Sequence, residues 1–230
     1  MRVLSKICLL SISSLALAEN SLGSATEGDH LVPVQKQNYR FRTILADKLA
    51  TTPFDCGRVT IRPSFEGESS ISIYCGTERR ERRHCYLTYI IADDNLYQRT
   101  DGGSRPESAR KVTTHRINVE LPVRTAEALK EVWFQILKKT RSIDLPRQGL
   151  VRVPVDATAM EFSLPQSGAS PLLGEVDPFA PALGKKVKEL IILSQTLIRY
   201  SKAGPAAHSE IAARIDRQAN GLLQDLKRDH

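Results

Sequence analysis

Two clusters of basic side chains have the composition of anion-binding sites. The first consists of four arginines, interrupted by Glu81 and followed by His84, and its members are Arg79, Arg80, Arg82 and Arg83. The second is a group near the start of a predicted helix, and its members are Lys185, Lys186 and Lys188. Guanidinium groups bind carboxylates and phosphates through paired hydrogen bonds, whereas ammonium groups bind them as point charges. Both clusters are candidate binding sites, although a solvated hairpin tip and a solvated helix face have the same composition.

The lysine cluster also conflicts with a local rule of helix formation. Cations in the first turn of a helix oppose the helix dipole, and such a conflict can mark a functional site. If the helix begins earlier, at Asp177-Pro178, the lysines lie further along it and the conflict disappears. Residues 182–204 contain five basic residues and one acidic residue, so positive charge is concentrated in this segment in either case.

The motifs of common catalytic and cofactor-binding classes do not occur in the sequence. It has no G-x-S-x-G, Walker loop, G-x-G-x-x-G or EF-hand. Its five histidines never occur at close metal-ligand spacing, so we expect no metal and no cofactor. Cys56 and His115 form the one candidate pair of nucleophile and base. However, His115 alternates with Ile117 and Val119, which favours a hydrogen-bonded histidine in the core.

The first 18 residues have the three parts of a secretory signal peptide. Arg2 and Lys6 supply the positive region, residues 7–17 are apolar, and Ala16-Leu17-Ala18 fits the small-x-small cleavage rule. Cleavage after Ala18 leaves no transmembrane span and predicts a periplasmic or secreted protein. Loss of the two cations lowers the net charge from +7 to +5. We therefore expect an anionic envelope component or another protein as partner, and not nucleic acid.

Strand alternation indicates which two of the three remaining cysteines form a disulfide. If residues 71–75 and 85–89 pair antiparallel with partner numbers summing to 160, Cys75 lies opposite Cys85. Opposed residues are close enough to bond, and an oxidising compartment preserves the bond. A preceding hairpin whose partner numbers sum to 132, with Val59 opposite Ile73, places Cys56 on the other face. We predict a Cys75–Cys85 disulfide and a free Cys56. A bond from Cys56 to either of the others requires a bulge or a bend.

Apolar periodicity predicts the remaining elements. Residues 39–50 fit either a strand or the start of a helix, and residues 93–110 fit a long polar loop. Thr125 is the predicted N-cap of a helix that extends to residue 141 and buries Trp133. The other predicted elements are strands at 111–122, 150–155 and 157–165, and helices at 182–202 and 206–227, which Gly204-Pro205 separates.

Residues 57–200 resemble a group of exported bacterial proteins for which no activity is known. Their pattern is a strand, a helix ending in V-W-x-x-x-L-x-x-T-R, a strand with D-A/G-T-x-x-x-F, and a closing helix. The matching residues here are Val132, Trp133, Leu137, Thr140, Arg141, Asp156, Ala157, Thr158 and Phe162. The resemblance implies export and a shared fold, and it assigns a role to none of these residues.

Composition and pattern together predict an α+β protein. Hydrophobic residues make up 41% and charged residues 26%, as in globular domains. We expect an antiparallel sheet of five to six strands, crossed by one amphipathic helix, plus a C-terminal helical hairpin. The expected organisation is a signal peptide (1–18), a flexible leader (19–37), a sheet domain (38–165), a Pro/Gly-rich connection (166–181) and the hairpin (182–230).

The sequence favours a non-enzymatic exported envelope protein that binds a partner through a basic surface. Two alternatives remain open. One is a small envelope hydrolase whose site is assembled from distant residues. The other is a subunit of a secreted complex, in which Cys56 bonds to a second chain.

Overall fold

The computed structural model describes residues 31–34, 39–50, 55–78, 82–140, 158–176 and 183–228. The predicted signal peptide and the predicted strand 150–155 lie outside these ranges. The described elements are α1 (Tyr39–Leu49), β1 (Asp55–Arg62), β2 (Ser69–Glu78), β3 (Arg82–Ala92), α2 (Leu96–Arg99), the 3-10 helix η1 (Pro106–Lys111), β4 (Thr114–Leu121), α3 (Val123–Lys138), β5 (Ala159–Gln166), β6 (Ala169–Glu175), α4 (Lys185–Lys202) and α5 (Pro205–Lys227).

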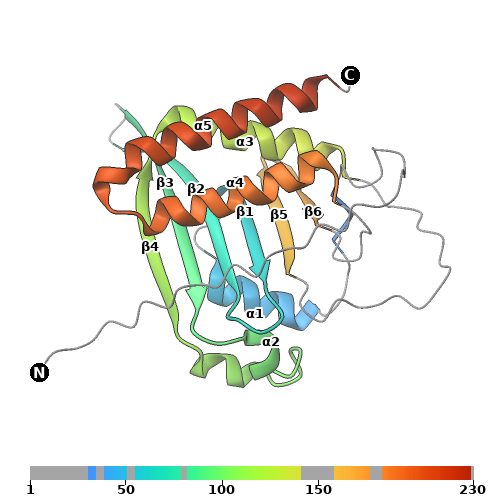
Figure 1. The fold of residues 1–230 in the computed structure, drawn as a ribbon. Coiled ribbons are helices and arrows are strands. Elements are labelled where there is room, and N and C mark those ends of the chain that lie inside the picture. The colour runs from blue at the N-terminus through green and yellow to red at the C-terminus, as the bar shows by residue number, and fades with distance from the viewer. Residues whose placement is uncertain are drawn as a thin grey trace, which may run out of the picture.

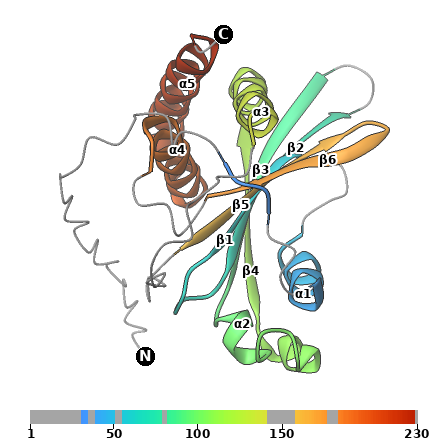
Figure 2. The ribbon, with the colours of Figure 1, turned by 90° about the vertical axis from the view of Figure 1, so that its right-hand side faces the viewer.

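Six antiparallel strands form one sheet in the order β4-β3-β2-β1-β5-β6 (Figure 1). α4 and α5 form an antiparallel hairpin, so the predicted α+β class, strand number and helical hairpin are confirmed. Figure 2 shows this hairpin on one side of the twisted sheet and α1 on the other. The main core lies between the sheet and α3–α5, and Trp133 and Phe162 are among its largest fully buried side chains. A second core lies beneath α1, where Phe41 and Leu49 pack with Ile90 of β3.

The predicted pairing of β2 with β3 is confirmed residue for residue. Ile73 lies opposite Leu87 and Cys75 lies opposite Cys85. The two cysteines form a disulfide with their Cα atoms 4.1 Å apart, and Cys56 is free. The observed partner numbers sum to 160, as predicted from the register that aligns the apolar faces and sets the two cysteines opposite each other.

The predicted pairing of β1 with β2 is wrong by two residues. Val59 lies opposite Ile71 rather than Ile73, and a bulge at Cys56 shifts the ladder. A two-residue shift keeps every side chain on the same face, so alternation cannot detect it. The intervening turn decides the register, and a remote residue holds it: the amide of Asn95 donates to three backbone carbonyls within residues 63–66.

Two segments predicted to be irregular carry structure. Residues 169–175, within the expected connection, form β6, because an edge strand tolerates a proline such as Pro171. In the expected flexible leader, Leu31 is fully buried in the main core. Val32 exchanges two backbone hydrogen bonds with Glu175 at 2.9 and 2.8 Å. The leader is therefore anchored at residues 31–32.

The ambiguous segment 39–50 is helical, and the expected polar loop 93–110 contains α2 and η1. A buried carboxylate stabilises α2, because Glu68 accepts hydrogen bonds from the N–H groups of Leu96 and Tyr97 at 2.6 and 3.0 Å. The side chain of Asn95 caps the same helix. Glu68 lies 28 positions before Leu96, so the local sequence showed only the Asn95 cap and not the carboxylate that stabilises the helix.

Three helix boundaries differ from the predicted ones. α3 begins at Val123 after Pro122, so Thr125 is not the N-cap; it is fully buried in the first turn. The ring of Pro122 fixes its φ near the helical value, so the helix begins after it although no side chain caps its first turn. α4 begins at Lys185 after Gly184, three residues later than expected. α3 ends at Lys138 rather than at residue 141. The start of α5 at Pro205 confirms the predicted first-turn proline.

Candidate functional site

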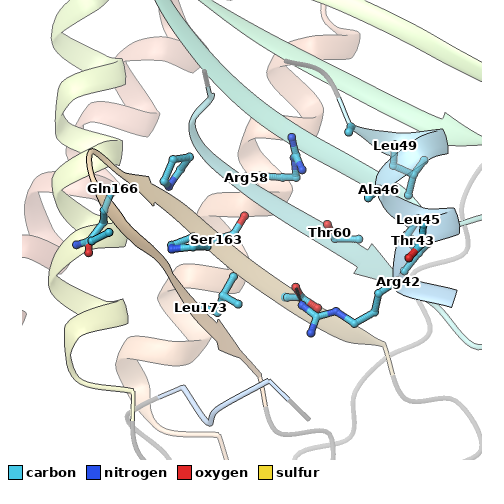
Figure 3. A pocket seen from close by; sticks show the side chains of 15 residues that line it. Arg42, Thr43, Leu45, Ala46, Leu49, Arg58, Thr60, Ser163, Gln166 and Leu173 are labelled. Carbon is cyan, nitrogen blue, oxygen red and sulfur yellow. Dashed lines mark hydrogen bonds and ion pairs between the residues drawn. The ribbon is translucent and has the colours of Figure 1, made fainter. Parts of the chain in front are cut away.

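A groove of about 650 Å³ lies on the α1 face of the sheet. α1 covers the β2–β3 side, where Ser70 Oγ donates to Leu49 O at 2.6 Å, and leaves β1, β5 and β6 as the groove floor. Figure 3 shows Leu45 and Ala46 on the α1 wall, with Thr60 and Ser163 on the floor. The groove therefore joins an apolar helical wall to a hydroxyl-bearing floor.

The polar part of the groove is organised around an ion pair. Arg42 Nη2 of α1 lies 2.6 Å from Glu161 Oε1 of β5. Arg58 of β1 donates from Nε to Ser72 Oγ at 3.2 Å. Thr60 pairs with Glu161 across β1 and β5, which places them on one face. This arrangement suits recognition of a small polar or anionic group. The described lining includes neither His nor Cys.

The structure describes part of the predicted arginine cluster. Arg79 and Arg80 lie outside the described residues, and for Arg82 only the backbone, in β3, is described. Arg83 is exposed and its Nη1 lies 2.5 Å from Glu127 Oε1 of α3. The one arginine of this cluster whose side chain is described is thus already paired.

The predicted lysine cluster occupies the first turn of α4. Lys185 Nζ lies 2.5 Å from Asp225 Oδ2 of α5 and 3.7 Å from Glu189. The hydrogen bond to Asp225 raises the pKa of Lys185, and the same bond lowers the pKa of Asp225. A carboxylate from the neighbouring helix thus offsets the conflict with the helix dipole. Lys186 is half-buried, and Lys188 is exposed.

Exposed side chains of α4 continue the charge beyond the first turn. They recur three or four positions apart, and so share one side of the helix. We call this set the α4 stripe: Lys185, Lys188, Ile192, Gln195, Arg199 and Lys202. Lys188 and Arg199 have no ion pair with any described residue, while Lys202 Nζ lies 5.2 Å from the ring centroid of Tyr89.

Sequence reasoning found Lys185 and Lys188 but missed Arg199 and Lys202. The sequence did show an excess of basic over acidic residues within 182–204. Only the helix phase shows which of these cations share a side.

The candidate pair of Cys56 and His115 is not brought together. Cys56 lies half-buried at the β1 bulge, whereas His115 lies on β4, three strands away and about five residues along the ladder. Strand spacing and rise separate the two by about 20 Å. The predicted core position of His115 is also wrong: its side chain is 65% exposed, and Nε2 lies 2.7 Å from Asp93 Oδ1. β4 is an edge strand, so this end of it is less covered.

Among the described residues, no group of three or more His, Cys, Asp or Glu side chains converges to hold a metal ion. None of the helices within the described ranges is long and apolar enough to cross a bilayer. No protein-family model, curated protein or solved structure matches the chain.

Proposed function

We propose that this is a non-enzymatic exported protein that binds an anionic envelope component through the α4 stripe. The observation that supports the proposal is the presence of four cations and no acidic residue in one exposed stripe of a single helix. The arginine cluster at residues 79–83 is a second, separate source of positive charge on the chain.

The α4 stripe has the features of a surface that meets anionic headgroups. Each Lys or Arg near an anionic membrane surface contributes roughly 1 kcal/mol to binding. Lys188 and Arg199 break no described ion pair when they bind. Ile192, between them, is 45% exposed and supplies apolar area in the same stripe. Charge and apolar contact therefore act on one partner surface.

Co-sedimentation with phosphatidylglycerol-containing vesicles tests the proposal. We expect binding at low salt, loss at high salt, and no binding to neutral vesicles, because exposed charges are screened. The double variant Lys188→Glu/Arg199→Glu should bind at least about tenfold more weakly, since each cation contributes roughly 1 kcal/mol, which is about fivefold in affinity.

Arg214→Glu/Arg217→Glu is the matched control, because both arginines are exposed on α5 and lie outside the stripe. It should retain most of the binding. Equal losses in the two variants would mean that net charge rather than the α4 stripe decides binding. Equal sedimentation with neutral and anionic vesicles would refute the proposal.

The two alternative functions, a hydrolase and a subunit of a secreted complex, predict different experimental results. A hydrolase would use the groove beside α1, where turnover of ester or peptide probes should depend on Glu161 or Ser163. A subunit of a secreted complex would show a Cys56-linked species on a non-reducing gel of the exported protein. Either result would displace the proposal of a non-enzymatic binding protein.

A further inference from the structure

The two edges of the sheet differ in how far their backbone groups are already paired. On β6, the backbone groups of Glu175 and Leu173 point away from β5, because Gly174 and Val176 face it. Val32 pairs with Glu175, and Pro171, the next outward residue after Leu173, has no N–H to offer. Prolines and short pairings of this kind protect sheet edges from association.

The β4 edge has neither form of protection. Asp93 N donates to Thr113 O, so alternate residues after Thr113 face β3 and those between them point outward. The outward residues are Thr114, Arg116, Asn118 and Glu120. No described strand pairs with them, and residues 114–121 contain no proline. Among the described contacts, one side chain reaches this row: Tyr200 Oη donates to Glu120 O at 2.7 Å, and that carbonyl has a second lone pair.

We propose that β4 pairs antiparallel with β4 of a second copy of this chain, about a two-fold axis at Asn118. In this register Arg116 lies opposite the partner subunit's Glu120, and Ile117 lies opposite the partner subunit's Val119. Symmetry repeats both pairs, so opposite charges meet on one face and apolar side chains on the other.

Neighbouring registers lack this complementarity. An axis at Ile117 sets Arg116 opposite the partner subunit's Asn118, which leaves both charges of the strand without an opposite charge. An axis at Arg116 sets two arginines directly opposite each other, which is unfavourable. The strand THRINVEL is thus self-complementary about its asparagine.

The side chains that this pairing needs are accessible. Glu120 is 70% exposed, and its one described side-chain contact is with His84 Nδ1 at 3.4 Å. Arg116 is exposed, and its Nη2 reaches Ala50 O at 3.5 Å, at the outer limit of a hydrogen bond. Ile117 and Val119 are half-buried beside the main core, and a second strand would cover them. The product is a continuous sheet with α4 of both copies on the same face.

Swapping the charges of Arg116 and Glu120 distinguishes specific strand pairing from a general loss of stability. Analytical ultracentrifugation of the intact disulfide-bonded protein should show a concentration-dependent dimer. Arg116→Glu and Glu120→Arg should each weaken the dimer by tenfold or more, because each sets like charges opposite one another. The double variant Arg116→Glu/Glu120→Arg should restore it. A protein that stays monomeric at its highest soluble concentration, or a double variant no better than the single ones, overturns the proposal.

Cross-linking tests the register itself. Cα atoms of a directly opposed hydrogen-bonded pair lie about 5.5 Å apart, within disulfide range. With Cys56→Ser as background, Asn118→Cys should therefore give an oxidised dimer. Thr114→Cys is the matched control, because the two copies of residue 114 lie eight positions apart along the pair, about 27 Å. Equal cross-linking of both variants, or cross-linking of neither, contradicts the proposed register.

Discussion

Gly57 lies at the β1 bulge directly against the ring of Trp133. A Cβ atom at this position would lie 1.9 Å from Trp133 Cε3, so α3 can pack on the sheet only because residue 57 has no side chain. The ring is fully buried and cannot move aside without displacing its neighbours. The absence of a side chain at residue 57 therefore allows the Trp133 ring to lie directly against the first strand.

Gly57→Ala should lower the free energy of unfolding by about 1–3 kcal/mol, the usual cost of forcing extra volume into a packed core. Urea unfolding followed by circular dichroism measures this. Gly221→Ala is the matched control, because the position is helical and has open space around it. It should stabilise the protein by about 0.5–1 kcal/mol. Destabilisation by both substitutions would show that the contact with Trp133 is not the cause.

Glu68 is a buried carboxylate whose ionisation the fold disfavours. Burial raises its pKa above the ordinary 4.5, although the N–H groups of Leu96 and Tyr97 and the charge of Arg62 act in the opposite direction. Because the pKa is higher in the folded state, the contribution of Glu68 to stability is complete below pH 4.5. It is lost as the pH rises through the raised pKa.

The free energy of unfolding of the wild type, relative to Glu68→Gln, should therefore fall as the pH rises from 4.5. The glutamine cannot ionise, so the variant lacks this component. Chemical unfolding of both proteins at a series of pH values gives the difference. A difference that stays constant, or that grows with pH, would show that the hydrogen bonds to Glu68 outweigh its burial.

The β2–β3 hairpin is the element that the sequence specifies most completely. One face carries Ile71, Ile73, Cys85, Leu87 and Tyr89 at every second position, and ten positions separate the two cysteines. The bond closes a short loop, for which chain-entropy arguments give roughly 2–4 kcal/mol of stability. Cys75→Ala/Cys85→Ala should therefore lower the unfolding temperature, and a reducing agent should destabilise the wild type by a similar amount. Insensitivity of the wild type to reduction would contradict this role.

Other elements were not predicted, because residues distant in the sequence stabilise them. The turn before β2 depends on Asn95, and α2 depends on Glu68. β6 contains Pro171 and has the composition of a connection, yet it is a strand because it lies at an edge. Residues from four separate segments line the groove beside α1, so no local sequence pattern predicts it. The lysines of α4 were predictable because they are adjacent in the chain.

Across the whole molecule, Asp225 reduces the positive charge available in the α4 stripe. It holds Lys185 in an ion pair between α5 and α4. If the stripe binds anionic vesicles, Asp225→Asn should strengthen that binding, because it frees one cation and removes one opposing charge.

Asp47→Asn is the matched control for this effect. It makes the same change of charge at an exposed position of α1, on the other face of the sheet. Co-sedimentation at one fixed ionic strength compares the two variants. Equal gains would assign the effect to net charge alone.

Trp133 is the only tryptophan of the chain, and it lies 1% exposed where α3, β1 and the main core meet. Its indole should emit at short wavelength in the native protein and shift to the red when water reaches this junction. Intrinsic fluorescence therefore reports the separation of helix from sheet without any label. An unfolding intermediate that keeps α3 in place would be invisible to this signal, and would appear only in the far-ultraviolet dichroism of the other helices.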